Sequence, residues 1–315
     1  MEYFNSNVEA EESPLSSHFF GAVTKEHSLE EKVLIVILPI CILGFIGNTI
    51  ILWLLCCRLR IKLSLYFVCV AVSNIVLIFC SIVDFVLVFT SLNFSLVLQR
   101  ILHILHLSSY YTGFYIVTTI AAERWCTHFF PVWYKQHRPK NFSAIMSLSL
   151  WGFSGLASFL RYYACPSTAK VHFHNIESCR TSSIIEIVTG IIFLPSMIFF
   201  TLGIWMRIQM RQEGTPLTRL DITIVAVVLL LLMLNVPPKV ATILKYWVSS
   251  IDGYMLGNIC ILLDSISSSV CPLVYLLVGC WKTQKSAESF LMFLEIALSD
   301  ERAVVVKTQA REEHA

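Results

Sequence analysis

Long apolar runs alternate with short polar segments along the chain. Seven stretches hold few or no charged residues, and each is close to or above the roughly 20 residues that a helix needs to cross a bilayer. Four contain an internal proline, which bilayer helices tolerate better than soluble helices do. The pattern predicts seven transmembrane helices, at Val33–Cys57, Leu65–Ser91, Ile101–Ala122, Phe142–Leu160, Ile184–Met206, Ile222–Val248 and Tyr254–Gly279.

The composition favours a membrane-embedded fold over a soluble one. Of the 315 residues, 56% are hydrophobic and 14% are charged, whereas soluble domains carry about 25% charged residues. A soluble protein that buried these helices would lack the polar sequence to wrap them. The expected fold class is therefore an all-α membrane protein, a seven-helix bundle embedded in the lipid bilayer.

Basic residues fix the expected orientation. The segments that follow the first, third, fifth and seventh runs hold eleven Lys or Arg residues, and the alternate segments hold five. Basic residues mark cytoplasmic loops, so we expect an extracellular N-terminus and a cytosolic C-terminus in the plasma membrane. The expected domains are an extracellular N-terminal tail at 1–31, the seven-helix bundle at 32–280 and a cytosolic segment with an amphipathic helix at 281–315.

The predicted extracellular segments contain candidate sites for two covalent modifications. Cys165 and Cys179 both lie between the fourth and fifth runs, and that compartment is oxidising, so we expect a disulfide. Asn93 begins an Asn-Phe-Ser glycosylation sequon, although its closeness to the membrane argues against its use.

The segment after the last run is amphipathic. In "CWKTQKSAESFLMFLEIALSDE" the apolar residues recur near helical spacing with Lys and Glu between them. This predicts a short amphipathic helix on the inner leaflet.

Several phrases resemble one receptor family. "GNTIILWLLCCRLR", "ERWCTHFFPVWYKQHRPKNFSA", "TPLTRLDITI", "GCWKTQ" and "ALSDE" are similar to the corresponding segments of the Mas-related G-protein-coupled receptors, within the rhodopsin-like class. The resemblance covers about residues 40 to 300.

The resemblance implies that an extracellular peptide or small molecule is bound and that a heterotrimeric G protein is activated. It assigns the coupling role to Glu123, Arg124, Pro131 and Tyr275. Arg124 stands at the hydrocarbon edge, where an unpaired charge is costly, and the adjacent Glu123 is its expected resting partner. The alternative is that Arg124 only anchors the helix at the interface.

Some positions depart from the wider class. Asn74 replaces the usual Asp of the second helix, and Cys271 replaces the Asn of Asn-Pro-x-x-Tyr. Hard cations need carboxylate oxygens, so we expect no high-affinity sodium site. The departures leave ligand-independent bias or a non-signalling orphan receptor as alternatives.

Ionisable and aromatic residues within or near the spans are pocket candidates. Arg161 and Ser183 stand where many family members have Glu and Asp, so we expect rejection of strongly cationic ligands and preference for an anionic or zwitterionic one. The alternatives are a Lys239–Asp264 pair and an Arg161 that extends to the headgroups. The candidates are Asp84, Tyr110, Arg161, Glu186, Lys239, Trp247 and Asp264.

The sequence disfavours two other function classes. A transporter is disfavoured by the odd number of spans and the lack of matching broken helices. An enzyme is disfavoured because no nucleophile motif appears, and His103 with His106 is a weak metal signal without a third ligand. We expect no cofactor, no metal and no nucleic-acid partner.

Overall fold

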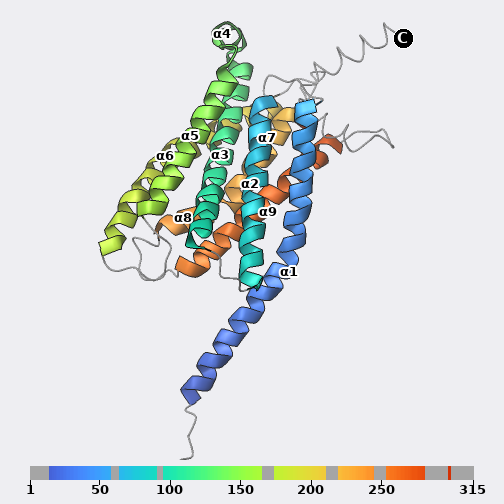
Figure 1. Cartoon of the computed structure of the whole chain (residues 1–315). Coiled ribbons are helices and arrows are strands. Elements are labelled where there is room, and N and C mark those ends of the chain that lie inside the picture. Colours follow the sequence, from blue (N-terminus) through green and yellow to red (C-terminus); the bar gives the residue numbers. More distant parts are fainter. Residues whose placement is uncertain are drawn as a thin grey trace, which may run out of the picture.

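The computed structural model describes residues 14–57, 64–90, 95–164, 174–210, 219–244, 253–280 and 297–298. Within these ranges the secondary structure is helical, with no strand. Figure 1 shows the long helices side by side in a bundle, with the short α4 at one end, called here the α4 end. The helices are α1 (Pro14–Cys57), α2 (Ser64–Thr90), α3 (Leu96–Phe129), α4 (Pro131–His137), α5 (Phe142–Ala164), α6 (His174–Gln209), α7 (Arg219–Leu234), α8 (Val236–Leu244) and α9 (Gly253–Cys280).

Six predicted membrane spans are confirmed as helices that are long and apolar enough to cross a bilayer. Among the described residues these are Val36–Cys57, Leu65–Leu87, Phe142–Tyr163, Ser183–Gln209, Arg219–Leu244 and Leu256–Cys280. The third prediction, Ile101–Ala122, falls within α3, which is less apolar than the six. Its polar side chains face protein, because α3 packs against α2, α5, α6 and α7, and Ser109 and Thr112 are buried.

Several helices extend beyond the predicted runs, and one predicted span is divided. α1 begins at Pro14, well before the first apolar run, and its first part projects beyond the bundle in Figure 1. Much of the predicted N-terminal tail is therefore helical. The predicted sixth span divides into α7 and α8 at Asn235, which forms a turn. Pro237 and Pro238 explain the break, because neither has an amide hydrogen to donate to the preceding turn.

Close packing of helices depends on small residues. Membrane helices gain little from hydrophobic burial against one another, so their contacts rest on close approach. Gly44 of α1 lies directly against Ser269 of α9, and a Cβ on the glycine would collide with that residue. The interior is filled by apolar side chains from most of the helices, among them Tyr66, Ile116 and Leu220, which are fully buried.

Candidate functional site

The α4 end of α3 carries a buried arginine whose partner lies on another helix. Arg124 is 6% exposed, and its Nε donates a hydrogen bond of 2.9 Å to Oδ1 of Asp221. Asp221 lies in the first turn of α7, where the helix dipole favours a carboxylate. Its Oδ2 lies 2.9 Å from Nε2 of His128, also on α3. The Asp221 carboxylate therefore joins α7 to two residues of α3.

The expected Glu123–Arg124 pair is replaced by separate partners. The Glu123 carboxylate accepts a hydrogen bond of 2.7 Å from Tyr66 of α2. It also contacts the hydroxyl of Tyr134 and lies 3.1 Å from Nη2 of Arg138. Adjacent residues on a helix point in different directions, and here Glu123 faces α2 and α4 whereas Arg124 faces α7. The structure therefore shows these partners in place of the predicted pair.

The short helix α4 holds the far side of the Glu123 cluster. Pro131 is its first residue, a position where the missing amide hydrogen costs nothing and the fixed φ angle suits a helix. Tyr134 follows one turn later, and its pKa is raised by burial and by the Glu123 carboxylate. Val132 and Trp133 are exposed. Pro131 thus acts on the cluster indirectly, by starting the helix that presents Tyr134.

Tyr275 lies inside the bundle and does not share the Arg124 contact. It is 3% exposed, its ring meets Phe67 of α2 edge-on with centroids 6.5 Å apart, and its hydroxyl accepts from Cys271 Sγ at 3.6 Å. The residue that replaces the usual Asn of this motif therefore still contacts the tyrosine of the same helix.

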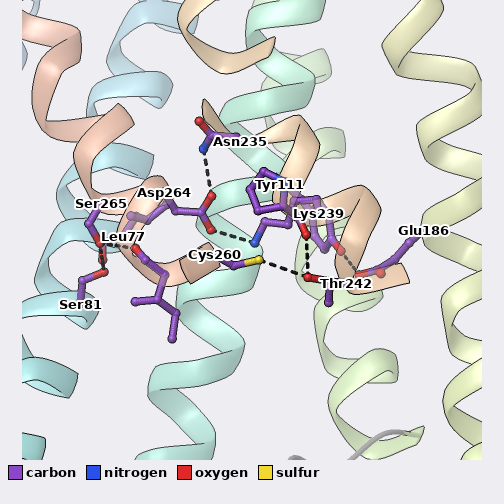
Figure 2. A network of polar contacts seen from close by, with 12 residues as sticks. Leu77, Ser81, Tyr111, Glu186, Asn235, Lys239, Thr242, Cys260, Asp264 and Ser265 are labelled. Atoms are coloured by element: carbon purple, nitrogen blue, oxygen red, sulfur yellow. Dashed lines mark hydrogen bonds and ion pairs between the residues drawn. The ribbon is translucent and has the colours of Figure 1, made fainter. Parts of the chain in front are cut away.

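A second polar cluster lies where α8 meets α9. Nζ of Lys239 lies 2.8 Å from Oδ2 of Asp264, which is fully buried. Nδ2 of Asn235 donates to the other carboxylate oxygen at 2.9 Å, and Figure 2 shows Asn235 and Lys239 converging on Asp264. The Lys239 ammonium also lies 4.2 Å from the centre of the Tyr110 ring. The structure therefore shows the Lys239–Asp264 pair, which the sequence offered as the alternative to a ligand contact.

The third charged group joins α5 to α6. Arg161 forms an ion pair with Glu186, and the hydroxyl of Tyr111 contacts the same carboxylate. The side chains of Arg161 and Glu186 are 17% and 11% exposed. Arg161 therefore has a partner within the protein. The two interpretations drawn from the sequence, a contact with ligand and a contact with lipid headgroups, did not include this partner.

The remaining predicted site residues do not join these clusters in the described structure. Asp84 is partly buried on α2. Trp247, Asn93 and Cys165 lie outside the described residues, as does the side chain of Cys179. The disulfide and the glycosylation site therefore stay predictions.

Sequence reasoning missed Asp221, His128 and Tyr66. Asp221 could have been found by the argument that singled out Arg124, because it is a lone carboxylate at the start of a long apolar run. His128 and Tyr66 gave no such signal, because histidine and tyrosine are ordinary residues near membrane interfaces.

Comparison with known proteins identifies relatives of the whole bundle. The chain is 31% identical over 271 residues to the proto-oncogene Mas of Rattus norvegicus, a match that covers 84% of this chain and 83% of that protein. It is 31% identical over 291 residues to the Mas-related G-protein coupled receptor member H of Mus musculus, covering 91% and 89%. It is 28% identical over 268 residues to the human Mas-related G-protein coupled receptor member X1, covering 83% and 81%.

No family model matches the chain. Relatives that are named G-protein coupled receptors agree with the six apolar helices and with the resemblance seen in the sequence. The chain belongs to the Mas and Mas-related family of G-protein-coupled receptors, and it is a multi-pass plasma-membrane receptor and not an enzyme.

Proposed function

We propose that this receptor passes a signal along the α7–α8 unit, from a ligand near Lys239 to a G protein at the α4 end. The supporting observation is that one helical span, Arg219–Leu244, carries a charged contact near each end. Asp221 meets α3 at the start of α7, and Lys239 meets α9 in α8. A ligand that alters the second contact can therefore tilt the helix that makes the first.

In this proposal α3 is the seventh span, which makes a bundle of seven transmembrane helices. Its 34 residues correspond to ~51 Å at 1.5 Å per residue, more than the hydrocarbon core of about 30 Å. An odd number of spans puts the termini on opposite sides. The excess of basic residues then assigns the α4 end to the cytosol and the N-terminus to the outside.

The Arg124–Asp221 contact is the proposed resting state of the switch. Both groups are buried, and removal of one partner from such a pair leaves an uncompensated charge, at a typical cost of about 3–5 kcal/mol. A G protein that supplies backbone acceptors to Arg124 removes that penalty and allows α7 to move away from α3. The switch therefore favours the open state only while a G protein is bound or a ligand biases α7.

The charge arrangement favours a zwitterion over a purely anionic ligand. Arg161 and Lys239 both have carboxylate partners, so an acidic ligand would leave Glu186 or Asp264 unpaired and buried. A ligand with adjacent ammonium and carboxylate groups can replace both halves of one pair at once. His106 Nε2 and Asn235 Oδ1 are buried without a hydrogen-bond partner among the described residues, and either can bind a further polar group of the ligand.

A nucleotide-exchange assay in membranes tests the coupling. The parent receptor, Arg124→Ala and Arg207→Ala are compared with purified heterotrimeric G protein, and Arg207 is the matched control because it is exposed near the end of α6. We expect Arg124→Ala to lose exchange when compared at matched surface expression, and Arg207→Ala to retain it. Equal exchange by the parent and Arg124→Ala would reduce Arg124 to an interface anchor.

The ligand class is tested with a second-messenger screen of short peptides and small metabolites on the parent receptor. The Arg124→Ala variant serves as the control that should not signal. Each zwitterionic compound is paired with its amidated, cationic form and its acetylated, anionic form. We expect only zwitterionic members to activate the parent. An amidated compound that activates equally well would contradict the assignment, because it has no carboxylate to meet Lys239.

A further inference from the structure

Two residues near the C-terminus are enclosed by the bundle. Ala297 and Leu298 are both 0% exposed, and they belong to the same apolar cluster as Leu220 and Ile224 of α7. A residue of an amphipathic helix that lay only on the inner leaflet would not be enclosed by protein in this way. This part of the chain therefore occupies a protein surface at the α4 end.

The contact includes a directed polar interaction with α7. The Thr223 hydroxyl lies 3.1 Å from the Ala297 carbonyl oxygen and 2.9 Å from that of Arg219, in the preceding turn. Its single proton is shared between these two acceptors. A buried carbonyl needs a hydrogen-bond donor, and Thr223 supplies one to Ala297.

Ala297 contacts α7 on the side away from α3. Successive residues of an α-helix are turned by about 100°, so Thr223 lies on nearly the opposite face from Asp221. Asp221 holds α7 to α3 through Arg124, and Arg219 donates to the carbonyl of Gly279 at the end of α9. The start of α7 is therefore held between α3 on one side and Ala297 and α9 on the other.

We propose that the segment containing Ala297 and Leu298 is an intramolecular brake on G-protein coupling. It contacts the face of α7 away from α3, holds α7 against α3, and must be released before α7 can move away from Arg124. The brake rests on the proposed coupling through α3 and α7. It adds a restraint on the movement of α7, and this restraint is part of the receptor's own chain.

The first test uses full-length receptor in lipid nanodiscs without added ligand. Leu298→Ala and Leu298→Asp are compared with Leu277→Ala, which removes the same atoms at a 71% exposed position of α9. Nucleotide exchange on purified G protein should rise roughly tenfold for the Leu298 variants, because a buried leucine contact holds the brake closed, and should stay at the parent level for Leu277→Ala. Hydrogen–deuterium exchange at 219–228 should rise in the same variants, with α2 unchanged.

Two controls separate the brake from the coupling assignment. Asp221→Asn opens the α3 contact directly and should raise nucleotide exchange whether or not the brake exists. A rise with Asp221→Asn but not with the Leu298 variants overturns the brake, as does unchanged hydrogen exchange at 219–228. No rise with either substitution counts against coupling through α3 and α7.

A cross-link gives the opposite result in the same system. The double variant Thr223→Cys and Ala297→Cys is made in the Asp221→Asn background, and its two cysteines are joined by a short disulfide-forming bifunctional thiol reagent. The cross-link should lower the raised nucleotide exchange to the parent level. Reductant should restore the raised exchange. Each single-cysteine variant controls for labelling of native cysteines. Full exchange by the cross-linked protein would show that fixing Ala297 to α7 does not restrain the movement of α7.

Discussion

Trp125 of α3 lies directly against Gly203 of α6, so closely that a Cβ on the glycine would collide with the indole ring. The ring is surrounded by Phe129, Phe199 and Phe200, with centroids 5.2, 5.5 and 5.5 Å away. Trp125 is the neighbour of Arg124, so this contact sets the position of the part of α3 that carries the switch.

Replacement of Gly203 by alanine should therefore destabilise the receptor. The added methyl group must displace a large ring in a crowded site, and overpacking of this kind typically costs about 1–3 kcal/mol. Thermal unfolding in detergent measures the effect. Gly190→Ala is the control on the same helix, because a Cβ there meets nothing within 4 Å and helix propensity alone favours alanine by about 1 kcal/mol. Equal shifts for the two variants would show that Trp125 moves aside freely.

Asp221→Asn should raise nucleotide exchange in the absence of ligand. The amide keeps the size of the side chain but loses the charge that holds Arg124, so the resting contact between α3 and α7 weakens. Combination with Arg124→Ala should abolish the gain, because the group that meets the G protein is then missing. The measurement is basal exchange at matched surface expression, and a double variant as active as Asp221→Asn would separate Arg124 from coupling.

Lys239→Met should lower the yield of folded receptor, because Asp264 would remain buried and uncompensated at a typical cost of about 3–5 kcal/mol. Addition of Asp264→Leu should restore the yield, since an apolar pair of similar size often replaces a buried ion pair without loss. The restored variant should still fail to respond to a zwitterionic activator found in the screen. Fluorescence-detected size exclusion measures yield, and a normal response by the restored variant would remove this pair from the pocket.

Cys165 and Cys179 should be linked in receptor purified from the cell surface. For a loop of this length the chain-entropy model gives about 3 kcal/mol of stabilisation. Mass mapping without reduction should recover one peptide that contains both residues, and the Cys165→Ser variant should unfold at a lower temperature. Two free thiols on surface-exposed receptor would refute the bond.

The sequence by itself determined that the chain lies in a membrane and which runs form its apolar helices. A helix in lipid must satisfy its own backbone and present apolar side chains, so long uncharged runs identify spans without any knowledge of their neighbours. Six runs could be recognised in this way. The run within α3 could be recognised too, although polar residues such as Thr112 lower its hydropathy. These residues are tolerated in α3 because they face other helices and not lipid.

Only the tertiary structure decided which charges meet. Arg124 pairs with Asp221 and not with Glu123, and Arg161 pairs with Glu186, because pairing depends on how each helix is rotated and tilted against the next. The same holds for the fit of Trp125 onto Gly203 and for the burial of Leu298. Spacing along one helix fixes the face on which a side chain lies, and the packing of separate helices decides what that face contacts.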